Sequence, residues 1–173
     1  MQDGPVVTFG MGESLFALPV ALVQEILDPR PVSRLPNAPR HLLGVIDVRG
    51  SSVAVIDLRT LLGESSRADQ PDTRIMVLQL RPRTEQAGPL RVALRVDRVI
   101  EVTGLDDSRL EPLAEAAFID WDQRMVEGIG RRNGTFVAVL RVEGLFDRDV
   151  ISTFAARSPT EVREAMPVEL GTP

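Results

Sequence analysis

The chain has 173 residues, of which 43% are hydrophobic and 26% are charged, with a formal net charge of −5 and no cysteine. This length suits one ordinary domain or two very small ones, and no run of about 18 apolar residues is available to cross a membrane. The absence of cysteine excludes disulfides, thiolate metal sites and a cysteine nucleophile, and the N-terminus has no signal-peptide pattern, so we expect a cytoplasmic protein without direct membrane insertion.

Short runs rich in Val, Ile, Leu and Phe recur along the chain and predict an all-β fold. They lie at residues 6–11, 14–18, 44–48, 53–58, 74–80, 90–96 and 136–142. Gly, Pro, Asn and Asp mark the breaks between runs, a pattern typical of small barrels or a sandwich. The exception is the segment 19–27, where Val20, Val23 and Ile26 recur with helical spacing and Pro19 suits a first turn, which predicts a short helix.

Three further segments are polar or less regular. Residues 63–72 are interpreted as a polar linker. Residues 103–128 are expected to be irregular or partly helical, with Trp121 as a partly buried anchor. Near the C-terminus the sequence SPTE has a capping-box pattern, which predicts a short helix and then a tail within residues 148–173.

The chain contains an internal duplication. Residues 44–63 align with 128–147 at a shift of 84 positions, and residues 16–26 align with 92–102 at a shift of 76. The matched pairs include Gly44 with Gly128, Gly50 with Gly134, Val23 with Val99 and Glu25 with Glu101. Two matches in the same order indicate two copies of one small β unit, roughly residues 6–62 and 75–146, joined by the polar linker.

The duplication gives Arg49 a comparison, because the second copy has Asn133 at that place. Asn133 and Gly134 form a dipeptide typical of a two-residue hairpin turn, so the turn itself does not require arginine. Two interpretations of Arg49 stay open: an exposed, solvated arginine, or an interaction site that only the first copy carries.

No cluster of residues indicates catalysis, a metal site or a cofactor site. His41 is the only histidine, and its neighbours show no triad or ligand spacing. We therefore expect a protein that is not an enzyme and holds no metal or cofactor.

Nucleic-acid binding is opposed by charge and composition. Charges of both signs alternate along the chain, which has only six Phe, one Trp and no Tyr. Phosphate binding needs a clustered basic face, and single-strand binding needs aromatic side chains for stacking. We therefore expect no nucleic-acid partner, and keep an OB-like barrel that binds oligonucleotides as the alternative from another class.

Taken in order, several motifs resemble the CheW family of chemotaxis coupling proteins. They are VQEI at 23–26, RLPNAP at 34–39, GVIDVRG at 44–50, VAVIDLRTLLG at 53–63 and VDRVIEV at 96–102. The resemblance runs over residues 5–147. It implies one domain made of two tandem, five-stranded, SH3-like or OB-like β-barrels with short helices, between which strands are partly exchanged, followed by the C-terminal helix and tail.

The resemblance implies an adaptor that couples the cytoplasmic tip of a chemoreceptor to the regulatory domain of a CheA-type histidine kinase. The positions of this sequence that match the family's receptor contact are Val23, Glu25, Gly44 and Arg49. The kinase contact is expected on an apolar barrel-end surface, chiefly of the second copy, with no residue assigned. The expected protein is a monomer in solution that joins receptor arrays at the membrane.

The sequence departs from the family's usual pattern at positions that leave the pathway open. Ala54 stands where the family usually has proline, and Arg132 and Arg141 make the hairpin of the second copy more basic. An adaptor of a non-flagellar pathway, for pilus motility or surface sensing, is therefore an alternative to an adaptor for swimming.

Gly44 and Glu25 have counterparts in the second copy, which favours a structural reason for both.

Overall fold

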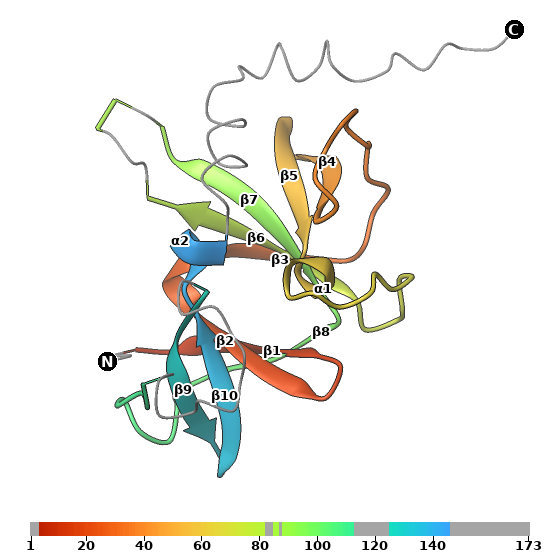
Figure 1. The fold of residues 1–173 in the computed structure, drawn as a ribbon. Coiled ribbons are helices and arrows are strands. Elements are labelled where there is room, and N and C mark those ends of the chain that lie inside the picture. The colour runs from red at the N-terminus through yellow and green to blue at the C-terminus, as the bar shows by residue number, and fades with distance from the viewer. Residues whose placement is uncertain (1–3, 82–84, 87, 113–124, 146–173) are drawn as a thin grey trace, which may run out of the picture.

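The computed structural model shows a mostly β protein with two five-stranded sheets and a few short helices (Figure 1). It describes residues 4–81, 85–86, 88–112 and 125–145. The expectations for Trp121 and for a helix and tail in residues 148–173 lie outside these ranges. Within them, no helix is long and apolar enough to cross a bilayer.

Every β-type run predicted from the sequence forms a strand, which confirms the all-β class. The strands are β1 (Val6–Met11), β2 (Ser14–Pro19), β3 (Val23–Leu27), β4 (Leu42–Val48), β5 (Ser51–Asp57), β6 (Arg74–Leu80), β7 (Leu90–Val96), β8 (Arg98–Thr103), β9 (Val126–Arg132) and β10 (Thr135–Leu140). The short helices are η1 (Val20–Leu22), α1 (Leu58–Leu61) and α2 (Val142–Leu145).

The helix predicted over residues 19–27 is wrong. Only the single 3₁₀ turn η1 forms there, and the chain then extends as β3, which pairs antiparallel with β6. Along β3 burial alternates, with Val23 and Glu25 partly buried and Gln24 and Ile26 exposed. The β-branched residues that suggested a helical face suit an edge strand equally well, and pairing with β6 decides the outcome.

The two sheets have the same internal order. Sheet A runs β8-β1-β2-β10-β9 and sheet B runs β3-β6-β7-β5-β4, and they occupy the lower and upper halves of the molecule in Figure 1. In each sheet a parallel pair, β2 with β10 or β7 with β5, joins two antiparallel sets. Each copy of the duplication supplies strands to both sheets, so neither copy completes a sheet by itself.

The two sheets share one hydrophobic core. Phe9 and Phe16 of sheet A stack with ring centroids 5.9 Å apart. They belong to the same buried cluster as Ile56, Met76 and Leu94 of sheet B. Because this cluster contains side chains from both sheets, burial of apolar surface fixes the sheets against each other.

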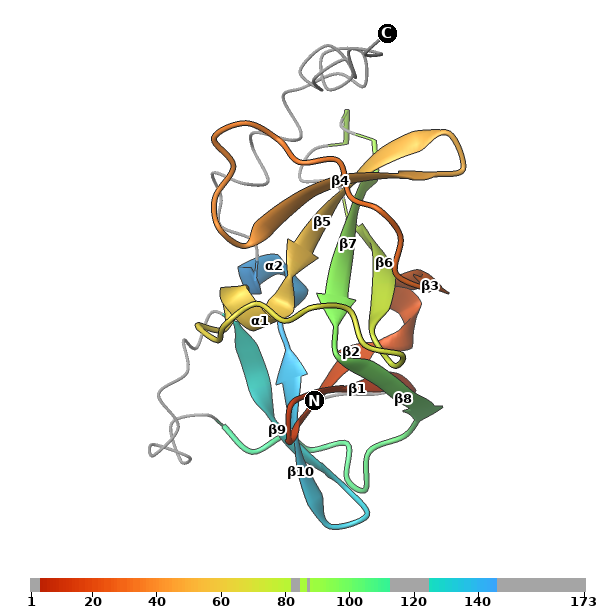
Figure 2. The same ribbon diagram turned by 90° about the vertical axis from the view of Figure 1, so that its right-hand side faces the viewer.

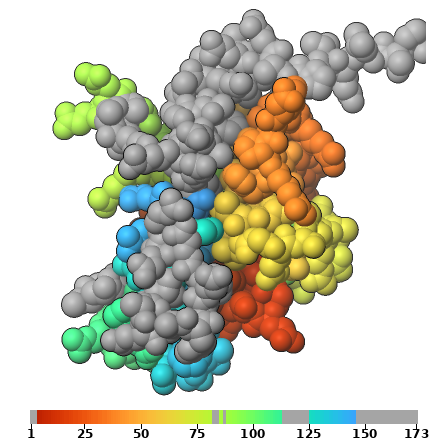
Figure 3. Space-filling view, viewed as in Figure 1, coloured from red at the N-terminus to blue at the C-terminus, as the bar shows by residue number. Residues whose placement is uncertain are grey.

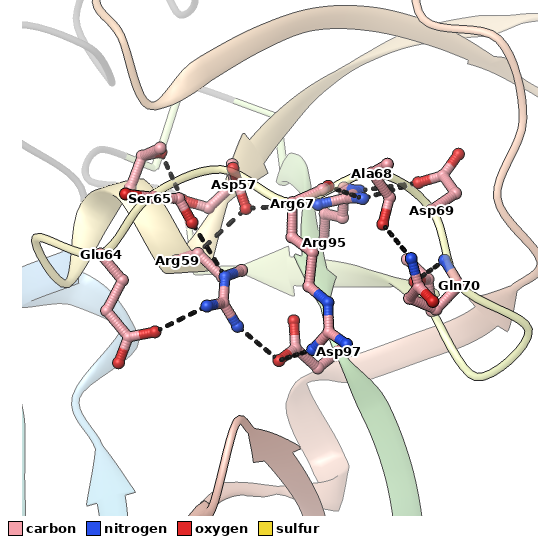
Figure 4. A network of polar contacts seen from close by, with 12 residues as sticks. Asp57, Arg59, Glu64, Ser65, Arg67, Ala68, Asp69, Gln70, Arg95 and Asp97 are labelled. Carbon is pink, nitrogen blue, oxygen red and sulfur yellow. Dashed lines mark hydrogen bonds and ion pairs between the residues drawn. The ribbon is translucent and has the colours of Figure 1, made fainter.

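The polar linker is held against β7 by a buried arginine. Arg95 donates to Oδ1 of Asp69 from Nε at 3.0 Å and from Nη2 at 2.7 Å, and to the carbonyl oxygen of Arg67 at 2.6 Å (Figure 4). Its Nη1 lies 3.6 Å from Oδ1 of Asp57, which is fully buried at the end of β5. These contacts fix the linker onto sheet B.

Asp97, between β7 and β8, connects the two sheets. Its Oδ2 accepts the backbone N–H of Gly12, in the β1–β2 turn of sheet A, at 2.8 Å. The same oxygen accepts a hydrogen bond of 2.6 Å from Nη1 of Arg59. Arg59 lies in α1, which directly follows β5 of sheet B. Arg59 also pairs with Glu64 at 3.1 Å and donates to the carbonyl oxygen of Ser65 at 2.9 Å (Figure 4).

Candidate partner-binding surfaces

The β4–β5 turn holds Arg49 in a left-handed backbone conformation. Arg49 has φ 52° and Gly50 has φ 83°, while Asn133 and Gly134 of the β9–β10 turn have φ 51° and 78°. Positive φ at both central residues is the type I′ arrangement that matches strand twist in a two-residue hairpin. The two turns are therefore equivalent in backbone, and arginine is the less favourable residue for this conformation.

Arg49 and Glu25 form an ion pair that joins the two edges of sheet B. The Nε of Arg49 lies 3.1 Å from Oε2 of Glu25. Glu25 is on β3 and Arg49 is in the turn that follows β4, and these strands stand first and last in the sheet order. The Arg49 side chain is 81% exposed while that of Glu25 is 21% exposed, so most of the guanidinium faces solvent.

The second copy contains an ion pair that matches the one between Arg49 and Glu25. In sheet A, Nε of Arg132 lies 3.1 Å from Oε1 of Glu101 on β8. Arg132 directly precedes Asn133, the counterpart of Arg49, so an offset of one residue hides the match in the alignment. An arginine–glutamate contact is thus common to both copies. What distinguishes Arg49 is its exposure, because the Arg132 side chain is only 32% exposed.

Gly44 has a backbone reason to be glycine. It is buried with φ 144°, and a Cβ at this position would collide with the carbonyl oxygen of Ser33. Ser33 pairs with Val45 through two backbone hydrogen bonds of 2.9 and 2.8 Å, so it cannot withdraw freely. Gly128 is crowded in the same way, since a Cβ there would lie 2.8 Å from Cβ of Leu110.

The structure brings together only some of the positions carried over from the resemblance. Glu25 and Arg49 are in contact, and Val23 lies two residues before Glu25, partly buried against the core. Gly44 is elsewhere, covered by residues 32–33. It supports the path of β4 and does not present a surface.

Exposed apolar side chains on the edge strands were not predicted from the sequence. Ile26 on β3 is 41% exposed, and Ile100 and Val102 on β8 are 46% and 58% exposed. The repeat places Ile26 and Val102 at equivalent positions, and β3 lies above β8 on the same side of the molecule (Figure 2). They are sequence neighbours of Glu25 and Glu101, and because side chains alternate along a strand they lie on the opposite strand face from these glutamates. This alternation could be predicted only if residues 23–27 were recognised as a strand.

The hairpin of the second copy carries an exposed aromatic ring. Phe136 on β10 is 60% exposed, and the guanidinium carbon of Arg131 lies 4.9 Å from its ring centroid. The equivalent residue of the first copy is Ser52. This tip is therefore apolar in one copy only, which makes Phe136 a candidate for the barrel-end contact that the sequence left unassigned.

Asp106 fixes the β9–β10 turn. Its Oδ1 and Oδ2 accept the backbone N–H groups of Asn133 and Gly134, each at 2.9 Å. These two hydrogen bonds, aided by the charges of Arg132 and Arg131, hold the pKa of Asp106 below its usual value. The turn that corresponds to that of Arg49 thus has its own carboxylate clamp.

The described residues contain no group of three or more His, Cys, Asp or Glu side chains placed to hold a metal ion. His41, the histidine singled out in the sequence, has its Nε2 buried without a hydrogen-bond partner, and its carbonyl oxygen accepts the N–H of Asp57 at 2.8 Å. Its position is that of a packed residue beside β5.

Comparisons with known proteins agree with this architecture. The CheW-like domain family matches residues 5–150. The chemotaxis protein CheW of Helicobacter pylori is 29% identical over 143 residues, covering 83% of this chain and 81% of that protein. The chemotaxis protein CheW of Rhizobium meliloti is 26% identical over 162 residues, covering 92% and 90%.

A solved structure shares the fold. The crystal structure of the scaffolding protein TtCheW from Thermoanaerobacter tengcongensis superposes with a TM-score of 0.71 at 26% identity, covering 83% of this chain and 92% of that chain. The match extends over both sheets, because each sheet draws on both halves of the sequence. The chain therefore belongs to the CheW family of chemotaxis scaffold proteins.

Proposed function

We propose that this protein is a non-catalytic adaptor that couples the cytoplasmic tip of a chemoreceptor to the regulatory domain of a CheA-type histidine kinase, within receptor arrays in the cytoplasm. Family membership supports the adaptor role, and the relatives are named chemotaxis and scaffolding proteins. The observation that carries the proposal is the Arg49–Glu25 pair, whose guanidinium is largely exposed at the edge of sheet B.

The receptor side uses Val23, Glu25 and Arg49. A receptor tip is a long helix, which can present an apolar stripe and acidic side chains to a flat surface. Val23, on the same strand face as Glu25, offers apolar contact, and the guanidinium of Arg49 has donors beyond the Nε that contacts Glu25. Glu25 orients Arg49, so both members of the pair matter even though only Arg49 is extensively exposed. Gly44 contributes indirectly, by keeping β4 and its turn in place.

The kinase side uses the end of the second copy's barrel, with Phe136 as its apolar contact. A buried aromatic anchor is a common source of binding energy at such interfaces. The cation–π contact with Arg131 holds the ring in position before binding, which lowers the entropy lost when the complex forms.

The proposal is tested by titrating the purified protein with a receptor-tip fragment and with a kinase regulatory domain from the same genome. Wild type should bind each one, and the two partners together should form a ternary complex. Arg49→Glu should weaken only the receptor complex, and Phe136→Ala only the kinase complex. Absence of both binary complexes would contradict the proposal, and so would a single variant that abolishes both while remaining folded.

A further inference from the structure

A cleft of about 530 Å³ lies in the first copy between the β3–β4 connection and the polar linker. Residues between Pro29 and Arg34 line one side and residues 66–69 of the linker line the other, with Leu43 and Arg95 between them. In the space-filling view the orange residues of the connection lie directly above the yellow residues of α1 and the linker (Figure 3). The volume falls within the range of ordinary ligand-binding pockets.

The lining of this cleft is strongly basic, although the whole chain has a net charge of −5. It includes four arginines and one aspartate, Asp69. Among the described residues, Arg30 makes a single hydrogen bond, to the carbonyl oxygen of Asp47 at 3.2 Å. Within the same ranges the side chain of Arg67 has only a long ion pair of 3.8 Å, with Asp97, and Arg34 has no hydrogen bond or ion pair. Their remaining donors are available to an anion.

The cleft also has a fixed wall and an apolar floor. Arg95, whose side chain is 10% exposed, holds the linker through Asp69 and the backbone of Arg67, so the linker wall is set before any ligand arrives. On the floor, Val32 and Leu43 are partly buried against the core of sheet B. An occupant would therefore meet both a charged rim and an apolar surface.

The duplication shows that the fold does not require these arginines. The second copy forms a cleft of about 620 Å³ beside its own β8–β9 connection, lined in part by Asp106, Asp107 and Glu111. Both connections are fixed in the same manner, by an isolated bridge to β4 or β9. The two connections are thus equivalent, although the linker forms the other wall of the first cleft and β9 that of the second. Only the first cleft has a rim dominated by arginine.

We propose that the cleft of the first copy binds an extended acidic segment of a partner protein, with carboxylates at Arg30, Arg34 and Arg67 and an apolar side chain over Val32 and Leu43. Arginine clusters recognise acidic motifs through charge-assisted, often bidentate hydrogen bonds. The apolar floor favours a peptide over a free inorganic anion. This site is additional to the receptor and kinase contacts proposed above.

The test measures fluorescence anisotropy of labelled peptides added to the full chain. The probe is a peptide of four Glu-Glu-Leu repeats, compared with a Gln-Gln-Leu peptide and an all-glutamate peptide of the same length. We expect the Glu-Glu-Leu peptide to bind at least about tenfold more tightly than either comparison peptide, with affinity that falls as salt rises. Equal binding of the Gln-Gln-Leu or all-glutamate peptide, or no binding at about 1 mM protein, would overturn the proposal.

Charge reversal locates the binding to this cleft. Arg30→Glu combined with Arg34→Glu should weaken binding of the Glu-Glu-Leu peptide at least about tenfold. The control is Arg109→Glu, at a residue that lines the second cleft, which should leave peptide binding unchanged. Arg34→Gln alone removes no contact of the described structure and should still weaken binding severalfold, which guards against misfolding of the double variant. Unchanged affinity in Arg34→Gln and in a folded double variant would overturn the proposal.

Discussion

Arg49 and Glu25 meet across the opposite edges of sheet B, with Nε of one 3.1 Å from Oε2 of the other. Arg132 and Glu101 make the same contact in sheet A at the same distance. The contact therefore belongs to the architecture of both copies. Arg49 differs from Arg132 because it lies in a turn and its side chain is largely exposed to solvent. The effect of Arg49 on stability can therefore be separated from its effect on binding.

Arg49→Asn should leave stability nearly unchanged. The lost ion pair is exposed on the arginine side and contributes little, and asparagine adopts the left-handed turn more readily, as Asn133 does. We expect the free energy of unfolding to change by less than about 1 kcal/mol, while receptor-tip affinity falls about tenfold. Urea denaturation and titration of the tip measure the two. Arg132→Gln is the matched control, and a comparable loss of tip affinity there would contradict a special role for Arg49.

Gly44→Ala should destabilise the fold by about 2 kcal/mol or more. The new Cβ would collide with the backbone of Ser33, and φ 144° is unfavourable for alanine. Gly50→Ala is the control, because Gly50 also has positive φ but nothing lies within 4 Å of its added Cβ, so strain alone should cost roughly 1 kcal/mol. Chemical denaturation compares them. Equal stability of the two variants would show that the close approach at Gly44 is unimportant.

Asp106→Asn should reduce the dependence of stability on acidic pH. The pKa of Asp106 is lowered in the folded state from a reference of 3.8, so its contribution is present above that reference value and is lost as pH falls through the folded-state pKa. Wild type should exceed the variant in stability at pH 7, and the difference should shrink in strong acid. Urea titrations at several pH values test this, and a difference that grows on acidification would have the wrong sign.

Asp97 and Arg59 should be strongly coupled in a double-mutant cycle. Their side chains are 11% and 16% exposed, and their contact of 2.6 Å links α1 to the oxygen that also holds Gly12. We expect Asp97→Asn to cost about 2–3 kcal/mol of unfolding free energy and the coupling with Arg59→Gln to exceed about 1 kcal/mol. Arg49→Gln with Glu25→Gln, an exposed pair, is the comparison and should couple more weakly. Equal coupling energies would show that burial does not strengthen this contact.

Local patterns in the sequence predicted the strands well where runs of Val, Ile, Leu and Phe lie between clear turn signals, as in β4, β5 and β10, but they did not single out β8 or β9. The segment 23–27 failed because Val23 and Ile26 fit both a helical face and an edge strand, and only pairing with β6 distinguishes them. Duplication of the sequence was visible, but the sheet order was not, because either copy could supply the partner strand with the same local pattern.

The candidate site was predictable only in part. The turn at Arg49 and the backbone role of Gly44 followed from comparison of the copies. The pair between Arg132 and Glu101 did not, because its offset of one residue conceals it in a residue-by-residue alignment. The basic cleft was also invisible, since its four arginines come from three separate segments: the β3–β4 connection, the linker and β7. The contact of Arg95 with Asp69 holds the linker beside β7.

The most direct test of the adaptor account measures the autophosphorylation rate of the kinase with a receptor-tip fragment, in the presence and absence of this protein. The account predicts that wild type makes kinase activity depend on the receptor. Arg49→Asn should lose that dependence at equal concentration while still binding the kinase. Kinase activity that does not respond to wild type with receptors and kinase from the same genome would contradict the account.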